Sequence, residues 1–545
     1  MEQRALLAFV ISLIILIGYQ ALFIPAPQAP PAPEVTGAPS APAPAQSSGS
    51  APAEVADVAP PGGQPASPPA IRRPPSAPEK LATVETELFR AVFSSYGGRL
   101  KHFELKDYAL TAGAESPPLD MVVSERVLPL GLYWRAGDGA VMGDRDVVYD
   151  VTVDRERVGA GERATVTLTA ATDAGARLTK RLTIDGDSYV LGFEADVDAQ
   201  GDPALGVAWA RSAPREAAGR MGGTEGPAVL VGGELEAEQS YGLDEIVFHK
   251  GVVSWAGYAD HYFLAAFYPD QPTELSFVAD PSTPGSVEAQ LWNEIADGRV
   301  AYNLFIGPKR IRMLGELGHA LDRAVDLGWF TVVARPLLEF LFLIHRVTGN
   351  YGWAILLLTI AIRVVYYPIN KKQVGAMKAM QRIQPELKKI QEKYKDDRER
   401  LNKEMIETYR RHKVNPMSGC WPMLLQIPVF IGLYNALMQA IELRHAPFFG
   451  WITDLSQPDR LGSLPIPFVE PPGIPVMTLL MGASMIIQQR MTPSMGDPTQ
   501  QRMMMLMPVF FTVFFVNMPA GLVLYWFANN VLMIGQQYMT NRASA

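Results

Sequence analysis

The chain has 545 residues, of which 48% are hydrophobic, and carries a formal net charge of −8. This length leaves room for two or three domains, and the slight excess of acidic residues argues against non-specific binding to nucleic acid. A single cysteine, Cys420, excludes an intramolecular disulfide. Its position deep in the chain favours a buried thiol at a helix end over a lipidation site.

Residues 1–24 predict a transmembrane anchor. An apolar run of about 20 residues follows the charged head that contains Arg4, and this length suffices to cross a bilayer. A cleaved signal peptide is the alternative, but the run exceeds a usual signal-peptide core and no clean cleavage site follows it. Because positive charge is retained inside, we expect a cytoplasmic N-terminus.

Residues 25–80 are dominated by Pro, Ala, Ser and Gly. Such a composition cannot bury enough apolar surface to offset the entropy of ordering the chain. It predicts a disordered, semi-rigid tether with polyproline II character.

Residues 81–318 predict a large extracytoplasmic β domain. Apolar and polar side chains alternate along 163–172 and 177–184, with turn residues between the two runs. A third strand carries four apolar residues on one face: Leu191, Phe193, Ala195 and Val197. Successive hairpins of this kind are typical of an antiparallel β-sandwich.

This domain shows no catalytic or metal-binding pattern. His102, His249 and His261 are scattered without metal-ligand spacing. Asp260 precedes His261 directly, but adjacent residues of a strand face opposite ways. We therefore predict no catalytic residue, metal or cofactor, and no phosphate-binding loop for a nucleotide is found. A groove for a protein partner or a sugar stays open as an alternative.

Residues 319–347 predict amphipathic helices on the extracytoplasmic membrane surface. The segment 329–346 is strongly apolar but is interrupted by Arg335, Pro336 and Glu339. In a spanning helix each of these two charges would cost roughly 2.5–3.5 kcal/mol. A helix in the interface, with its charges toward water, avoids this cost, so we favour it over a spanning helix.

Residues 348–545 predict a membrane core with five apolar segments. These segments lie at about 350–370, 418–440, 475–491, 503–517 and 519–538. The loop between the first two has about twice as many basic as acidic residues, which places it in the cytoplasm. With the anchor, this gives a polytopic bundle of six transmembrane helices with both termini in the cytoplasm.

The cytoplasmic loop, residues 371–417, predicts a helical hairpin. Its apolar residues recur every three or four positions, with an interruption at Asp396 and Asp397. They are Met377, Met380, Ile383, Leu387, Ile390 and Tyr394 before the interruption and Leu401, Met405 and Tyr409 after it. A packed connector explains these facing stripes, and the basic outer face additionally suggests docking.

Arg363 lies inside the first core span, about 10 Å from its cytoplasmic end. Thr359 precedes it by one turn on the same face. Other polar residues in the spans are Gln426, Asn435, Gln439, Gln488, Gln489, Asn529 and Asn530. No span contains an acidic partner, and a buried unpaired guanidinium needs water. The pattern predicts a hydrated concavity open to the cytoplasm; the alternative is that Arg363 snorkels to the headgroups.

The segment 503–517 is short, about 22 Å long as a helix against a hydrocarbon core of about 30 Å. A short span thins the bilayer locally or tilts little. Its Met- and Phe-rich surface suits adaptable packing, so core packing and a recognition surface are both open.

The residues from about 329 to 540 resemble the YidC family of membrane protein insertases. Five motifs, in order and with the spacing of that family, carry the resemblance: GNYGWAILLLTIAIRVVYYPIN, QPELKKIQEKY, VNPMSGCWPMLLQIPVFIGLY, LRHAPFFGWITDLS and MPVFFTVFFVNMPAGLVLYWFANN. The anchor, tether and β domain resemble the longer Gram-negative form, which FRAVFSSYGGRL and HYFLAAFYP fit more loosely.

The resemblance implies an inner-membrane protein that inserts nascent membrane proteins and helps them fold, alone or with the Sec translocon and its accessory complex. It implies a periplasmic β-supersandwich and a groove carrying Arg363. Groove or substrate-contact positions would be Thr359, Gln426, Trp526 and Asn529. Some members dock ribosomes through a long basic tail. This chain ends in QQYMTNRASA, so we expect ribosome contact through the hairpin or the short loop with Arg490 and Arg502.

Two other functions predict different features. A solute transporter would show internal repeats and matching broken helices, whereas five core spans with one large hairpin show no such symmetry. A membrane-tethered periplasmic enzyme would need a convergent polar cluster within 81–310, and none is evident. We therefore expect a non-enzymatic insertase.

Overall fold

The computed structural model describes residues 78–542, except 114, 125, 136–138, 200–202, 213–224, 296, 396, 415–420, 468, 470 and 492–497. The chain divides into two units, residues 1–74 and 75–545, and the described residues belong to the second. The predicted anchor, most of the predicted tether and Cys420 lie outside the described residues.

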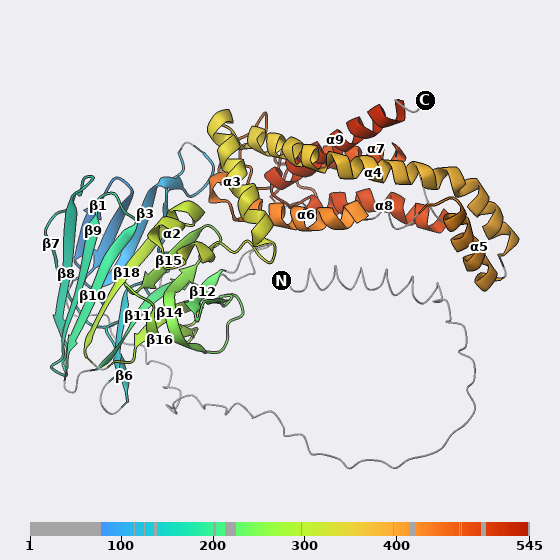
Figure 1. The fold of residues 1–545 in the computed structure, drawn as a ribbon. Helices are drawn as coiled ribbons and strands as arrows, with labels where there is room; N and C mark the ends of the chain where they lie inside the picture. The colour runs from blue at the N-terminus through green and yellow to red at the C-terminus, as the bar shows by residue number, and fades with distance from the viewer. Residues whose placement is uncertain are drawn as a thin grey trace, which may run out of the picture. The chain divides into compact units, whose positions relative to one another are not determined.

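The first half of the described chain is a β domain of antiparallel strands (Figure 1). Its strands are β1 (Leu81–Glu85), β2 (Phe89–Ser94), β3 (Arg99–Ala109), β4 (Pro118–Asp120), β5 (Gly131–Arg135), β6 (Val141–Gly143), β7 (Asp150–Val153), β8 (Arg163–Ala171), β9 (Arg177–Asp185), β10 (Val190–Asp198), β11 (Ala204–Ser212), β12 (Gly226–Val231), β13 (Glu234–Ala237), β14 (Val247–Ala259), β15 (Phe263–Tyr268), β16 (Thr273–Asp280), β17 (Ser286–Asn293) and β18 (Arg299–Pro308).

These strands form a sandwich of two sheets. A 4-stranded sheet has the order β1-β2-β3-β4. A 14-stranded sheet has the order β6-β5-β11-β17-β16-β14-β15-β18-β10-β9-β8-β7; in addition, β12 pairs with β14, and β13 pairs with β12. One apolar cluster includes the inner faces of both sheets, for example Phe103 of β3 and Phe193 of β10. The predicted antiparallel sandwich is therefore confirmed.

The three consecutive antiparallel strands β8, β9 and β10 show why alternating apolar and polar side chains predict these strands well. Val166 of β8 lies opposite Leu182 of β9, which in turn lies opposite Phe193 of β10. All three side chains are fully buried, while the intervening Thr and Arg residues are exposed or half-buried. Period-two patterning places alternate residues on opposite faces of a sheet.

A buried charge network joins the two sheets. Lys180 of β9 is fully buried, and its ammonium lies 2.5 Å from a carboxylate oxygen of Asp144. It also donates to three backbone carbonyls: Gly97 (2.9 Å), Gly98 (3.0 Å) and Leu130 (2.7 Å). Burial lowers the pKa of Lys180 to about 8, while Asp144 opposes this shift.

Asp144 is the shared acceptor of this network. Arg99, at the start of β3, donates to it at 2.8 Å, and the Tyr149 hydroxyl donates at 3.0 Å. The backbone N–H of Leu132 donates a further bond at 3.1 Å. Because buried charges are stable only when paired and hydrogen-bonded, the network ties β9 to the turn before β3.

The histidines of the β domain lie apart, and the described residues contain no cluster suited to a metal ion. The prediction that Asp260 and His261 are strand neighbours is wrong, because both lie in the turn between β14 and β15. Asp260 pairs with Arg211 at 2.9 Å. The His261 ring instead contacts the backbone carbonyl of Met438 at 2.8 Å, so the pair forms no dyad.

A broken helical segment follows the β domain. It comprises α2 (Ile311–Leu317), the 3-10 turn η1 (Leu321–Ala324) and α3 (Thr331–Thr348). The positive φ angles of His319 and Ala320 separate α2 from η1, so the amphipathic stretch is not one helix. The two charges near the middle of the predicted apolar segment have partners: Arg335 pairs with Asp322 at 3.0 Å, and Glu339 pairs with Arg312.

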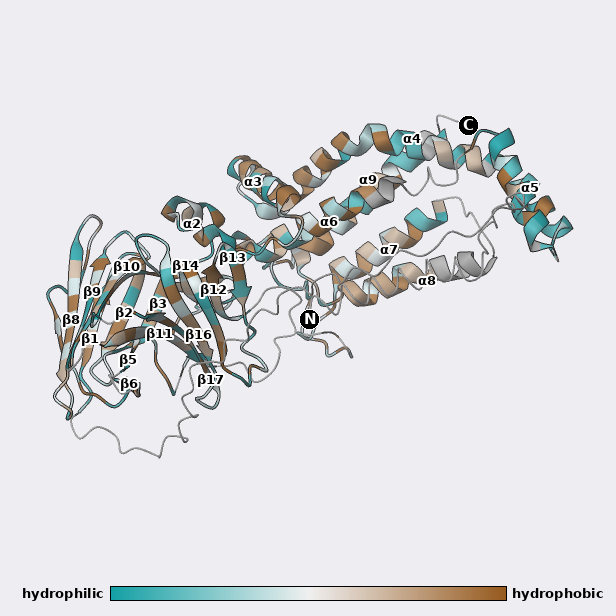
Figure 2. Cartoon of the chain, turned by 60° about the horizontal axis from the view of Figure 1, so that its bottom comes forward, coloured by the Kyte–Doolittle hydropathy of each residue, from teal (hydrophilic) through white to brown (hydrophobic). Residues whose placement is uncertain are grey.

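The remaining helices include one in each predicted apolar segment. They are α4 (Tyr351–Lys393), α5 (Arg398–Arg411), α6 (Trp421–Gln439), the 3-10 turn η3 (Ile441–Leu443), α7 (Val476–Met491), α8 (Pro498–Phe515) and α9 (Ala520–Arg542). Hydrophobic residues cover much of α6, α7 and α8, whereas α5 is largely hydrophilic (Figure 2). The helix α4 packs against α3 and α9, and α7 packs against α8 and α9.

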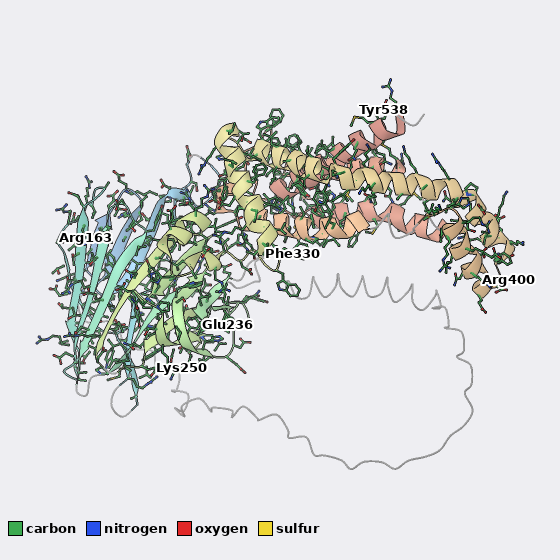
Figure 3. The ribbon with its side chains drawn as sticks, in the orientation of Figure 1. Arg163, Glu236, Lys250, Phe330, Arg400 and Tyr538 are labelled. Atoms are coloured by element: carbon green, nitrogen blue, oxygen red, sulfur yellow. The ribbon has the colours of Figure 1, made fainter. Side chains whose placement is uncertain are left out.

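The helix α4 extends through the predicted membrane boundary without a break. It has 43 residues and contains Pro368 and Pro385. Its second half pairs with α5 through a separate apolar cluster of Met380, Ile383 and Leu387, against which Met405 and Tyr409 pack. The second half of α4 and α5 thus pack as a helical hairpin, and the first helix of this hairpin is continuous with the first half of α4. Arg400 of α5 and Tyr538 of α9 carry exposed side chains (Figure 3).

Among the described residues, one helix is long and apolar enough to cross a membrane, over Tyr351–Met380. A shorter apolar stretch covers Met505–Phe515 of α8. Length and composition thus support one of the six predicted spans.

Replacing Asp144 by Ala tests the charge network. Because Lys180 and Arg99 would remain buried without their carboxylate, we expect the free energy of unfolding to fall by about 3–5 kcal/mol. Urea unfolding of the full chain in detergent, followed by tryptophan fluorescence, measures this change. The control is Asp185→Ala, which breaks an exposed ion pair with Arg163 and should change stability little. Equal effects of the two variants would contradict the role of the network.

Candidate polar site among the helices

Arg363 of α4 is held by a residue of α9. Its Nε donates to the side-chain oxygen of Asn529 at 2.8 Å, and Nη2 donates to the Asn529 carbonyl at 3.3 Å. The guanidinium is half-buried. Arginine has five N–H donors, so this pair of bonds leaves further donors for water or another ligand.

No ion pair of Arg363 occurs within 4.0 Å among the described residues. Asn529 is neutral, so it satisfies donors of the guanidinium without cancelling its charge. The local consequence is a half-buried positive charge between two apolar helices.

Two further polar contacts connect α4, α6 and α9 near this site. The Gln426 amide of α6 donates a long hydrogen bond of 3.5 Å to the hydroxyl of Tyr525 on α9. The Tyr366 hydroxyl of α4 donates to the Leu425 carbonyl at 3.2 Å. These bonds hold α6 beside α4 and α9 at the level of Arg363, since Tyr366 and Arg363 are one turn apart on the same helix.

Trp526 of α9 lies in an aromatic cluster. Its ring centroid lies 4.7 Å from that of Phe430 on α6, in an edge-on arrangement. Two phenylalanines of α8 complete the cluster, Phe515 at 5.0 Å and Phe511 at 5.8 Å. Ring pairs at these distances contribute beyond their buried area. The cluster therefore connects α9 with both α6 and α8.

Thr359 faces the packed interior. It is 0% exposed, and its hydroxyl donates to the Ile355 carbonyl of its own helix at 2.7 Å. Of the five predicted site residues, the structure thus brings Arg363 and Asn529 into direct contact. Gln426 and Trp526 lie nearby along α6 and α9, whereas Thr359 is covered.

Other polar residues of the predicted spans also join helices. Asn530 of α9 donates to the Ser484 hydroxyl of α7 at 3.1 Å, which is an interhelical bond. Asn435 of α6 donates to the carbonyl of Leu327, in the loop before α3, at 2.9 Å. Such bonds between apolar helices supply part of the association free energy. The prediction that some of these amides form interhelical hydrogen bonds is confirmed.

The opposite end of α7, α8 and α9 is fastened by two consecutive residues of the loop 440–475. Asp459 is buried and accepts from the backbone N–H of Met477, in the first turn of α7, at 2.7 Å. Such an acceptor satisfies one of the free N–H groups at a helix start. Arg460 donates to the Val516 carbonyl at 3.0 Å and to the Asn517 side chain at 2.9 Å. This pair therefore joins the start of α7 to the α8–α9 turn.

The contacts of Tyr525, Asp459 and Arg460 were not predicted from the sequence. A hydroxyl inside an apolar run needs a partner, and this signal was present for Tyr525. No local signal identifies Asp459 and Arg460, because their partners lie up to 57 residues away.

The chain matches two protein-family models. A model described as 60Kd inner membrane protein matches residues 343–545, and a model of the YidC periplasmic domain matches residues 81–340. Together they define an inner-membrane protein with a periplasmic domain.

Relatives match over the whole length. A protein described as membrane protein insertase YidC, from Geobacter sulfurreducens, is 38% identical over 554 residues, which cover 100% of this chain and 99% of that protein. One of the same description from Pelobacter propionicus is 38% identical over 568 residues, 99% of each chain. The chain belongs to the YidC family of membrane protein insertases.

A solved structure is also similar. It is described as an active YidC insertase with the first transmembrane domain resolved. It has 18% sequence identity, covers 85% of this chain and 93% of its own, and gives a TM-score of 0.38.

Crosslinking tests which predicted site residues are accessible. A photoreactive amino acid at Gln426 or Trp526 should crosslink a stalled nascent membrane protein, whereas one at Thr359 should crosslink weakly because that position is fully buried. The exposed neighbour Ile360 controls for depth along α4. A larger yield from Thr359 than from Gln426 would contradict the packing described here.

Replacing Arg460 by Ala tests the loop that fastens the helix ends. Hydrogen bonds from a charged donor contribute about 1.5–3 kcal/mol, so the variant should unfold at a lower temperature in detergent and expose the α8–α9 turn to protease. The matched control is Arg490→Ala, at the exposed end of α7. Unchanged unfolding and cleavage for Arg460→Ala would show that the loop does not fasten this turn.

Proposed function

We propose that this chain inserts nascent proteins into the inner membrane through the site around Arg363, and helps them fold there. The observation that carries the proposal is the hydrogen-bonding of Arg363, which has a neutral partner in Asn529 and no carboxylate within ion-pair distance among the described residues. A positive charge held in this way stays available to an acidic segment. The site would lie in a hydrated groove open to the cytoplasm.

Crossing the bilayer is costly for the polar end of the inserting segment. An acidic residue at the centre of a bilayer costs roughly 2.5–3.5 kcal/mol on insertion scales. A hydrated guanidinium partway across lowers this cost by attracting the carboxylate. The membrane potential adds about 2.3 kcal/mol per charge per 100 mV. The positive charge of Arg363 would not lower the cost of inserting a basic segment.

The apolar part of the substrate would move along α6 and α8. The described part of α8 exposes several large apolar side chains: Met505, Leu506, Met507, Val509, Phe510, Val513 and Phe514. Methionine and phenylalanine adapt to varied partners, which suits substrates of different sequence. The lipid-like surface of these helices would let a segment leave the groove sideways into the bilayer.

The topology that this mechanism needs has six spans: the N-terminal anchor, the first half of α4, α6, α7, α8 and α9. Both termini and the hairpin of α4 and α5 would be cytoplasmic, with the β domain and α3 on the periplasmic side. Two observations support this arrangement: the basic character of the hairpin and the helical stretch Tyr351–Met380, which is long enough to span.

The chain would work alone or beside the Sec translocon and its accessory complex. Ribosomes would approach the basic face of the hairpin, because nascent chains emerge on the cytoplasmic side. The chain would act without nucleotide hydrolysis, driven by burial of the apolar segment and by the membrane potential.

Replacing Asn529 by Asp gives a direct test. The new carboxylate would lie 2.8 Å from the Arg363 Nε position that now meets the amide oxygen, and it would neutralise the site. We expect insertion of a reporter with a short acidic periplasmic tail to fall as strongly as in Arg363→Ala. Protease protection of the reporter in inverted vesicles measures this.

Two controls separate charge from packing. Asn529→Ala removes the partner but leaves the charge, and Arg363→Lys keeps a positive group, so both should retain most insertion. Full insertion of every reporter by Arg363→Ala and Asn529→Asp would reject an essential role for the charge.

A further inference from the structure

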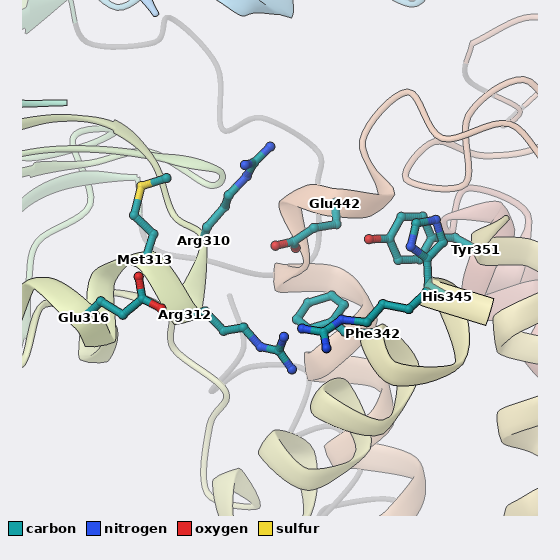
Figure 4. A pocket seen from close by; sticks show the side chains of 9 residues that line it. Arg310, Arg312, Met313, Glu316, Phe342, His345, Tyr351 and Glu442 are labelled. Atoms are coloured by element: carbon teal, nitrogen blue, oxygen red, sulfur yellow. The ribbon is translucent and has the colours of Figure 1, made fainter. Parts of the chain in front are cut away.

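A second polar site lies at the start of α4, about three helical turns before Arg363. A cavity of about 470 Å³ opens between α2, the C-terminal half of α3, the start of α4 and the turn η3 (Figure 4). Volumes in this range are typical of sites that bind small molecules or parts of larger ones. The mechanism proposed above makes no use of it.

The lining of this cavity carries mixed charge. Three arginines, Arg310, Arg312 and Arg346, and two carboxylates, Glu316 and Glu442, line it. Figure 4 shows Arg310 and Arg312 approaching from the α2 side, while Glu442 and Tyr351 approach from the other. A site with both signs of charge suits a zwitterion better than a simple anion, because each ligand charge then meets its opposite.

Among the described residues, one of the three arginines of the lining has a carboxylate partner. Arg312 pairs with Glu339, whereas no carboxylate lies within 4.0 Å of Arg310 or Arg346 among the described residues. Burial raises the pKa of Glu442, and Arg310 and Arg312 oppose that shift. A cationic group beside Glu442 would stabilise its ionised form.

Apolar surface adjoins the cavity directly. Val347, next to Arg346 on α3, is 86% exposed, and Leu343 one turn earlier is also exposed. On the α4 side, Trp353 is exposed two residues after Tyr351. A charged pocket within one turn of exposed aliphatic and indole side chains is typical of a segment at the membrane–water interface.

We propose that this cavity binds the headgroup of an ethanolamine phospholipid of the outer leaflet. The phosphate would lie between Arg310 and Arg346, and the ammonium would face Glu442. The acyl chains would follow the exposed side chains of Leu343 and Val347. The inference requires α3 to lie in the periplasmic interface, but it does not depend on the role of Arg363.

This arrangement has a consequence for the fold. The bound headgroup would link α2, which directly follows the last strand of the β domain, to α3 and to the start of α4. The lipid would thus be a structural ligand at the junction between the β domain and the membrane helices.

Native mass spectrometry of the delipidated full chain in detergent provides the test. Phosphatidylethanolamine, phosphatidylcholine and phosphatidylglycerol with identical acyl chains are offered together. We expect the ethanolamine lipid to be retained most, and Arg346→Gln to weaken that retention about tenfold, as for the loss of one charge-assisted contact. Glu442→Gln should reduce the preference for ethanolamine over choline. Arg177→Gln, an identical change on exposed β9, should have no effect.

Several results would overturn the proposal. Equal retention of all three lipids would indicate adventitious lipid only, and stronger retention of phosphatidylglycerol would indicate a site for anions. Displacement of the lipid by inorganic phosphate alone would indicate a free-phosphate site. Unchanged retention in Arg346→Gln would place the lipid elsewhere. Arg346→Lys, which keeps the charge, should restore binding if Arg346→Gln loses it through charge and not through misfolding. None of these measurements depends on insertion activity, so they test lipid binding independently of the proposed function.

Discussion

A guanidinium among apolar helices needs hydrogen-bond acceptors. The acceptors of Arg363 lie on α9, and this pairing constrains how the helices of the core pack. Both acceptors belong to one neutral residue, Asn529, so the bonds fix the approach of α4 to α9 without removing the charge. A carboxylate in the same place would have stabilised the pair more strongly and cancelled the site. The retained charge is therefore compatible with a function only if water or a substrate also reaches it.

The buried cation of the β domain, Lys180, is neutralised by a carboxylate. Lys180 is fully enclosed by three carbonyls and by Asp144, which also accepts from Arg99. No donor of Lys180 is left for a ligand, and the network joins the two sheets of the sandwich. Lys180 is thus neutralised by a carboxylate, whereas the hydrogen bonds from Arg363 to the neutral Asn529 do not cancel its charge.

The two ends of the helical core are held by different interactions. Near Arg363, α4, α6 and α9 are joined by the two bonds from Arg363 to Asn529, by Tyr366–Leu425 at 3.2 Å and by Gln426–Tyr525 at 3.5 Å. At the other end, Asp459 and Arg460 make several shorter bonds to α7 and to the α8–α9 turn. Polar side chains thus join the apolar helices at both ends of the core, through the side chain of a helix residue at one end and through loop residues at the other.

The sequence by itself determined the features that depend on neighbours along the chain. Alternation defined the β8–β9–β10 hairpin, three- and four-residue spacing defined the hairpin of α4 and α5, and an arginine in an apolar run identified Arg363. The pairing of Arg363 with Asn529, 166 residues later, was decided only by the tertiary structure. The tertiary structure alone also decided that Thr359 is covered, that Asp260 and His261 have different partners, and that Arg460 contacts the α8–α9 turn. The physical reason is that periodicity reports which face of its own element a residue occupies, whereas the identity of the partner across that face depends on how separate elements pack.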